Sequence, residues 1–293
     1  MPAASASARS PRLLGASMAF PASLVVLVII IVPIVLLFRY SFNHFDKVEM
    51  MKQAFTFENY ARFFSDPYYL GVFYSTLWVA ALCTVLALVL GFPVAYFLAK
   101  TQSRFKSLFI ILLVFALMVG NVVRSAGWMI LLGRAGVLNA ILTGLGLVKD
   151  PVQFMYTPAA VVIGSTAVVM PYFILTLQSV LEGIDFSVEE AAQNLGANFL
   201  TAFWRVVLPI AAPGVAAGTV LVFILCMNAY ATPVLLGGTG ITMMAPALYD
   251  QITRSSNWPF GAAMALILVC ATLLMALLSN WLIHRRYVKT MAS

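Results

Sequence analysis

The chain has 293 residues, of which 62% are hydrophobic and only 9% are charged. A soluble domain carries charge on about a quarter of its residues, so this composition excludes an ordinary soluble protein and makes lipid the solvent for much of the surface. The net charge of +7 does not indicate nucleic-acid binding, because the sequence has no basic run and no RNA-binding motif. We interpret the basic residues as topology signals that lie near anionic lipid headgroups.

Six apolar segments are each long enough to cross a membrane as a helix. Isolated strands would leave backbone groups unpaired in lipid, and no alternation of period two recurs along the chain. We therefore predict an all-α polytopic membrane protein with six transmembrane helices rather than a β-barrel. The predicted spans are residues 17–38, 71–98, 107–132, 158–181, 210–235 and 260–283.

The first apolar stretch is longer than the roughly 7–15-residue apolar region of a signal peptide, and no small-residue cleavage site follows it. We therefore expect it to be a retained span. The predicted organisation is an N-terminal tail at residues 1–16, a transmembrane domain at 17–283 and a C-terminal tail at 284–293. A polar segment at residues 182–209, which we call the docking loop, lies between the fourth and fifth spans.

Lysine and arginine in short loops set the orientation of a membrane protein. The basic clusters that directly flank spans lie in the N-terminal tail, in the 99–107 loop and at the C-terminus, whereas acids dilute the basic residues elsewhere. We therefore predict that both chain ends and the docking loop face the cytoplasm. The long segments 39–70, 133–157 and 236–259 are then outside. In the first of them, "FTFENYARFFSDPYYL" predicts a short helix at the membrane interface, or else a simple aromatic belt.

The docking loop contains the stretch "SVEEAAQNLGANFLTAFWRVVLP", which has strong signals of local structure. Ser187 and Glu190 have the spacing of a capping box, which predicts the start of a helix. Gly196 stands where that helix must end in a left-handed conformation. Asn198 can cap a second short helix, and Pro209 marks its junction with the next span. We predict a helix–turn–helix of fixed angle with an apolar shoulder, which is the shape of a docking element.

The docking loop resembles the EAA loop of ABC-importer permeases. The match consists of Glu190-Ala191-Ala192, Gly196, Val206 in place of the usual isoleucine, and Leu208-Pro209. In that family the loop holds a cytoplasmic coupling helix that sits in a groove of the ATPase subunit. The resemblance therefore implies the type I ABC-importer permease fold. It also implies a set of ATPase-coupling residues, namely Glu189, Glu190, Ala191, Ala192, Gly196, Ala197, Asn198 and Phe199.

Further motifs between residues 55 and 263 resemble the spermidine/putrescine-type permeases, specifically the first of the two permeases in such systems. They are "FTFENYARFFSDPYYL", "GFPVAYFLAKT", "LLGRAGVLN", "TPAAVVIG" and "NWPFGAA". The resemblance implies a bacterial cytoplasmic (inner) membrane location and three kinds of partner: two copies of an ABC ATPase, a second homologous permease chain and an extracytoplasmic substrate-binding protein. It implies a polyamine or related organic cation as the solute, with another small amine, an amino-acid-like solute or a zwitterion as the alternative.

The sequence has no nucleotide-binding motif and no catalytic motif. We therefore expect a transport subunit that is not an enzyme and holds no cofactor, with ATP and magnesium on the partner ATPase. His44 and His284 are isolated, which argues against a membrane enzyme and against a metal site. Cys83, Cys226 and Cys270 lie in apolar runs and are expected to be small buried hydrophobic residues.

Arg124 is the clearest ionisable residue inside a predicted span, and such residues are functional hypotheses by default. It either lines the transport path or pairs with the partner permease, or it satisfies backbone carbonyls at a helix break near Gly120. The stretch "CMNAYATP" is expected to break the fifth span. The candidate residues of the transport path are Asn121, Arg124, Trp128, Tyr172, Asn228, Tyr230 and Asp250. The alternative is that these side chains only pack, form hydrogen bonds between helices or are solvated.

No aspartate or glutamate lies firmly inside a predicted span. A secondary transporter usually needs such acids for ion coupling, together with an internal repeat, and we find neither. A gated channel would need a selectivity filter, which is also not evident. If the solute is a polycation, its charge must be recognised mainly by the binding protein and the partner permease.

Overall fold

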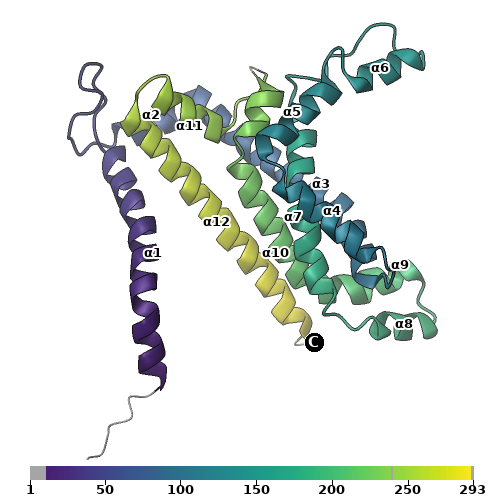
Figure 1. Cartoon of the computed structure of the whole chain (residues 1–293). Helices are drawn as coiled ribbons and strands as arrows, with labels where there is room; N and C mark the ends of the chain where they lie inside the picture. The colour runs from purple at the N-terminus through teal and green to yellow at the C-terminus, as the bar shows by residue number, and fades with distance from the viewer. Residues whose placement is uncertain (1–10, 239, 292–293) are drawn as a thin grey trace, which may run out of the picture.

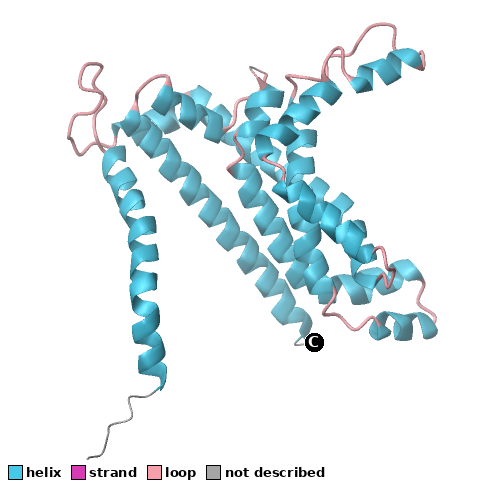
Figure 2. Cartoon of the chain, in the orientation of Figure 1, coloured by secondary structure: helices cyan, strands magenta, loops and turns pink. Residues whose placement is uncertain are grey.

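The computed structural model describes residues 11–238 and 240–291, and these are almost entirely helical (Figures 1 and 2). Within these ranges the extended structure is limited to one isolated bridge between His44 and Lys52. The elements are α1 (Pro11–Ser41), α2 (Glu58–Ser65), α3 (Pro67–Lys100), α4 (Lys106–Met118), α5 (Asn121–Leu132), α6 (Val137–Gly144), α7 (Pro158–Leu181), α8 (Ser187–Asn194), α9 (Phe199–Ala202), the π-helical turn η1 (Phe203–Val207), α10 (Leu208–Met227), the π-helical turn η2 (Pro233–Gly237), α11 (Met244–Thr253) and α12 (Trp258–Met291).

Six helical segments of the described chain are long and apolar enough to cross a membrane, which confirms the predicted number. They are Ser23–Ser41, Pro67–Lys100, Asn121–Gly144, Pro158–Leu181, Phe199–Met227 and Trp258–Ser279. The third segment differs most from the prediction at 107–132, because the chain breaks into α4 and α5 at Val119 and Gly120, both of which are extended. At the two ends, α1 and α12 remain helical beyond the predicted limits of their spans, and residues 1–10 of the predicted N-terminal tail lie outside the described residues.

The core is formed where α3, α7 and α10 pack against one another. The ring of Phe173 on α7 is fully buried between glycines of the two other helices. A Cβ at Gly91 on α3 would lie 2.7 Å from this ring, and a Cβ at Gly218 on α10 would lie 2.9 Å from it. The two glycines therefore allow three helices to approach closely around one aromatic side chain, as small residues commonly do between membrane helices.

The three cysteines are divided between the core and the surface. Cys83 on α3 and Cys226 on α10 are buried, as predicted. The same prediction is wrong for Cys270, which is exposed on α12. An apolar run in a membrane helix does not specify burial in protein, because lipid is also an apolar solvent.

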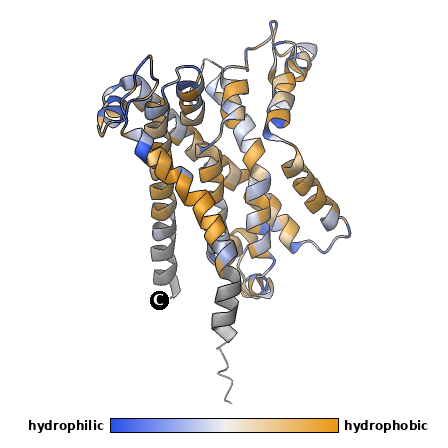
Figure 3. Ribbon diagram, turned by 60° about the vertical axis from the view of Figure 1, so that its left-hand side comes forward, coloured by the Kyte–Doolittle hydropathy of each residue, from blue (hydrophilic) through white to orange (hydrophobic). Residues whose placement is uncertain are grey.

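The apolar faces of the outer helices are extensively exposed in the single chain. In the membrane window of α1, Ser23–Ser41, no residue is buried inside the protein, and apolar residues dominate this part of the helix (Figure 3). α1 packs mainly against α12, and α4 has no buried residue. Surfaces of this kind require lipid or another membrane helix as their neighbour.

The ends of the helices form two separate groups. The start of α1, the end of α12 and the helices α8 and α9 lie at one end of the molecule, whereas α2, α6 and α11 lie at the other (Figure 1). This arrangement agrees with the predicted grouping of the loops. The predicted short helix in residues 39–70 is α2, and its Asn59 amide donates 2.9 Å hydrogen bonds to the carbonyls of Ser41 and Asn43.

Candidate functional site

The first backbone N–H of α8 is paired with Asp185, which is neither of the two residues predicted to form the capping box. Asp185 Oδ1 accepts a 2.9 Å hydrogen bond from the backbone N–H of Ser187, and this bond lowers the pKa of Asp185. Phe186 occupies the N-cap of α8 and makes no side-chain capping bond. The predicted capping box of Ser187 and Glu190 is therefore wrong, because an aspartate two residues before the helix satisfies its free amide instead.

The end of α8 has the predicted left-handed glycine. Gly196 has a φ of +95°, its N–H bonds to the Gln193 carbonyl, and the N–H of Ala197 bonds to the Ala192 carbonyl. These two bonds form a Schellman motif, which ends a helix at a fixed angle. The prediction that Asn198 caps the second helix is also confirmed, since its Oδ1 accepts a 2.7 Å bond from Thr201 N.

An exposed apolar surface surrounds this bend. Leu195 is 90% exposed, and the exposed side chains that follow it along the chain are Phe199, Leu200 and Trp204. Large apolar side chains gathered beside polar ones are typical of an interaction site. Of the predicted coupling residues, those exposed are Glu190, Ala191, Gly196, Asn198 and Phe199, and those partly buried are Ala192 and Ala197.

Glu189 has a different position, because it points into the protein and is only 1% exposed. Its two carboxylate oxygens accept hydrogen bonds of 2.8 and 2.7 Å from the Tyr96 hydroxyl on α3. Lys100 Nζ lies 3.1 Å from Glu189 Oε2, and the Gln193 amide donates to Oε1 at 3.2 Å. Spacing along the sequence cannot reveal this contact, because Tyr96 and Glu189 are 93 residues apart.

Arg124 ties the broken third span to the fourth. Its Nη1 donates to the Val168 carbonyl at 3.1 Å, and its Nη2 donates to Asn121 Oδ1 at 2.5 Å. Its Nε is buried without a partner in the described structure. Val168 precedes Pro171, the proline inside α7. These contacts favour the structural interpretation of Arg124, in which it satisfies a backbone carbonyl where two helices are irregular.

The predicted break in the fifth span is confirmed, because α10 ends at Met227 and the chain at Ala229 and Tyr230 is not helical. The Asn228 side chain bonds to a carbonyl of its own helix. The Tyr230 ring lies 5.0 Å from the Tyr249 ring.

The remaining candidates are Trp128, Tyr172 and Asp250. Asp250 is on α11 next to Tyr249, whose ring contacts Tyr230, and it pairs with Arg254 just beyond the end of this helix. Trp128 and Tyr172 are partly buried, and Trp128 packs against the core. Among all seven pathway candidates, only Asn121 and Arg124 are joined by a hydrogen bond in the described structure.

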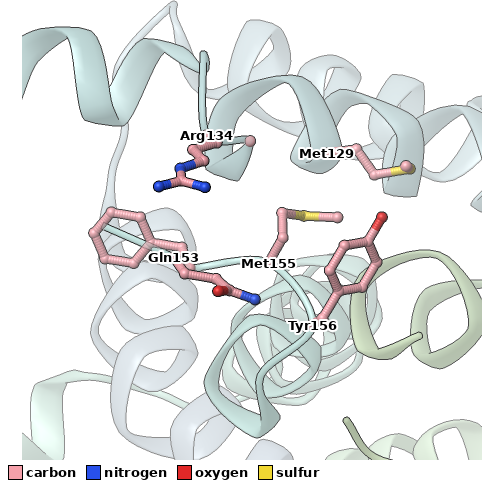
Figure 4. A pocket seen from close by; sticks show the side chains of 7 residues that line it. Met129, Arg134, Gln153, Met155 and Tyr156 are labelled. Carbon is pink, nitrogen blue, oxygen red and sulfur yellow. The ribbon is translucent and has the colours of Figure 1, made fainter. Parts of the chain in front are cut away.

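A pocket of about 340 Å³ lies at the end of the molecule opposite the docking loop, and the sequence analysis did not predict it. Figure 4 shows Arg134 and Met129 on one side of the pocket and Gln153, Met155 and Tyr156 on the other. The residues that line it are Met129, Gly133, Arg134, Gln153, Phe154, Met155 and Tyr156.

The motif "LLGRAGVLN" builds the frame of this pocket. The Asn139 amide donates to the carbonyls of Gly133 and Val152, and its Oδ1 accepts from Val152 N at 2.8 Å. A Cβ at Gly136 would lie 2.5 Å from the Ile130 carbonyl oxygen, so a glycine is needed there. The motif could have indicated one side of the pocket. Its spacing does not reveal that residues 153–156 form the other side.

Comparison with known proteins identifies the family. Residues 87–286 match the family described as binding-protein-dependent transport system inner membrane component. The chain belongs to this family. It is 34% identical over 249 residues to the spermidine/putrescine transport system permease protein PotB of Salmonella typhimurium, which covers 85% of this chain and 86% of the relative. It is 32% identical over 263 residues to PotB of Haemophilus influenzae, which covers 88% and 91%.

The fold agrees with this membership. A bacterial alginate ABC transporter, solved in complex with an alginate-bound periplasmic protein, superposes with a TM-score of 0.78 at 16% identity, covering 94% of this chain and 95% of that chain. The predicted fold class, a permease of the ABC-importer type with six membrane helices, is confirmed. The chain is therefore a multi-pass permease subunit of a binding-protein-dependent transport system in the bacterial inner membrane.

Proposed function

We propose that this chain forms half of the translocation path of an ATP-driven importer, and that a separate ATPase acts on it through α8 and the bend at Gly196. The observation that carries the proposal is the rigid bend with its exposed apolar surface. The Schellman motif and the Asn198 cap fix the angle between α8 and α9. Leu195 and Phe199 project into solvent beside this bend, where a partner protein can bury them.

The proposed orientation places both chain ends and α8 in the cytoplasm. The start of α1, the end of α12 and α8 share one end of the molecule (Figure 1), and the basic residues that flank the spans concentrate there. ATP and magnesium then belong to two copies of the ATPase. A second, homologous permease chain would cover part of the exposed apolar surface of α1 and α4, and a substrate-binding protein would dock at the outer end near α2, α6 and α11.

For the solute we propose a polyamine such as putrescine or spermidine, since the relatives at 34% and 32% identity are named for these compounds. None of the six candidate spans contains an aspartate or glutamate. Recognition of the positive charges therefore falls mainly to the binding protein and the partner permease. A different small amine, an amino-acid-like solute or a zwitterion is the alternative.

The test uses the whole assembly. The chain is purified with the ATPase, the second permease and the binding protein encoded beside its gene, and ATP hydrolysis is measured in nanodiscs with polyamines, other organic cations and zwitterions. Stimulation by putrescine or spermidine is the expected result. Stimulation by another solute alone would refute the polyamine assignment, and failure to purify with any ATPase would refute the importer mechanism.

A further inference from the structure

The buried carboxylate of Glu189 joins the docking loop to a helix that is distant in sequence. Moving a charged carboxylate out of water is costly unless charged and hydrogen-bonding partners surround it. Here Tyr96 and Lys100 supply those partners from the last turns of α3. The covalent connections of α8 lead only to α7 and, through α9, to α10. The Glu189 contact is thus a third connection, to α3.

Aromatic rings enclose this contact and restrict its geometry. The Tyr96 ring meets the rings of Phe186 and Phe203 edge to face, with centroids 5.8 and 6.1 Å away. Lys100 Nζ lies 5.6 Å from the centroids of both Tyr96 and Phe186, within cation–π range. A rotation of α8 relative to α3 would therefore separate the buried Glu189 carboxylate from Lys100 and disturb the packed rings.

The opposite end of α3 is joined to the outer helix α11. The buried hydroxyl of Thr76 accepts a 2.8 Å hydrogen bond from the backbone N–H of Met244, at the start of α11. The Gln251 amide donates to the Tyr69 hydroxyl at 3.2 Å. At about 1.5 Å per residue, the 34 residues of α3 span about 51 Å. One continuous helix thus makes polar contacts with the docking loop at one end and with α11 at the other.

We propose that Glu189 is a positioning residue that fixes α8 to α3, and that α3 conveys movement between the docking loop and α11 at the outer end. The inference rests on the proposed function, in which an ATPase moves α8. It assigns Glu189 a role inside the permease, whereas Glu190, its exposed neighbour, is left to face the partner.

The proposal predicts uncoupling rather than loss of assembly. In the reconstituted complex, Glu189→Gln removes the charge that pairs with Lys100, and Thr76→Val removes the bond to α11 with little change in shape. Both variants should still purify with the ATPase, and Thr76→Val, which lies far from the docking loop, should hydrolyse ATP at the basal rate. Stimulation by the loaded binding protein should fall about tenfold or more, since coupling free energies typically correspond to about 5- to 150-fold effects.

Two matched controls accompany these variants. Glu182→Gln breaks a pair with Lys106 that also links the docking loop to a helix, but the Glu182 side chain is 40% exposed, whereas that of Glu189 is 1% exposed. Thr84→Val removes a hydroxyl of α3 that bonds only to the Ala80 carbonyl of the same helix. Both should keep stimulation within about twofold of the wild-type value, because exposed pairs and bonds within one helix contribute little.

Three outcomes would overturn the proposal. One is normal stimulation in both Glu189→Gln and Thr76→Val, and another is equal loss in the matched controls. The third is loss of ATPase binding in Glu189→Gln together with normal coupling in Thr76→Val. This result would mean that Glu189 only stabilises the fold of the docking loop and does not connect it to α3. Absence of stimulation in the wild-type complex would instead refute the proposed function, so the two failures are distinguishable.

Discussion

The bend at Gly196 gives a prediction whose size follows from the structure. Its φ of +95° lies in a region that L-residues rarely adopt, and a Cβ placed there would meet no atom within 4 Å. The cost of Gly196→Ala is therefore that of the backbone alone, about 1–2 kcal/mol. This energy lowers the population of the bend by about 5- to 30-fold. Membrane insertion should be unaffected, because the bend lies outside the spans.

Three variants at this position separate backbone strain from charge. Gly196→Asn should lose less stimulation of ATP hydrolysis than Gly196→Ala, because asparagine tolerates positive φ better. Gly196→Asp introduces a side chain similar in size to asparagine but adds a negative charge at the C-terminal end of α8. The helix dipole disfavours a negative charge there by about 0.3–1 kcal/mol. We expect Gly196→Asp to abolish stimulation while the protein remains in the membrane. Wild-type coupling in both the alanine and the aspartate variants would refute the docking role of the bend.

Three further predictions concern other regions. Asn139→Leu should lower the Tm in detergent, because it leaves the N–H and the carbonyl of Val152 without their bonds to Asn139, at about 1–3 kcal/mol each; an unchanged Tm would contradict a stabilising role of these bonds. Gly136→Ala should destabilise the protein more than Gly144→Ala, whose Cβ meets no atom within 4 Å, and equal Tm values would refute this. Hydrogen bonds from Lys52 and two amides lower the pKa of Asp46 from 3.8 to about 2. Because the folded-state pKa is the lower one, this stabilisation is present above pH 3.8 and is lost as the pH falls toward 2. Amide hydrogen exchange in the 42–57 loop should therefore become faster over this pH range, relative to the intrinsic rate, and an unchanged relative rate would contradict the prediction.

The local chemistry of the docking loop could be predicted where one residue determines the conformation. Gly196 and Asn198 have the predicted roles because positive φ and side-chain capping depend on neighbours within a few residues. The capping box was wrong because Asp185, Ser187 and Glu190 compete for the same free amides. The sequence contains all three candidates but does not rank them.

Contacts between helices that are far apart in the sequence could not be predicted from the sequence. The partners of Glu189 and Arg124 lie 93 and 44 residues away, respectively, and no periodicity specifies such pairs. The exposure of Cys270 has the same cause, since hydropathy does not distinguish lipid from protein as the neighbour. The pathway candidates were chosen for their polarity or their aromatic faces, and neither property specifies which contacts they make within the chain.

The most direct test of the central claim is cross-linking at Leu195, the most exposed apolar side chain of the docking loop. Leu195→Cys is introduced together with Cys270→Ala, which removes the exposed native thiol, and the complex is treated with a thiol cross-linker in native membranes. The account predicts a cross-link to the ATPase and no labelling of intact cells by a membrane-impermeant maleimide. Labelling from outside, or a cross-link only to other membrane chains, would contradict it.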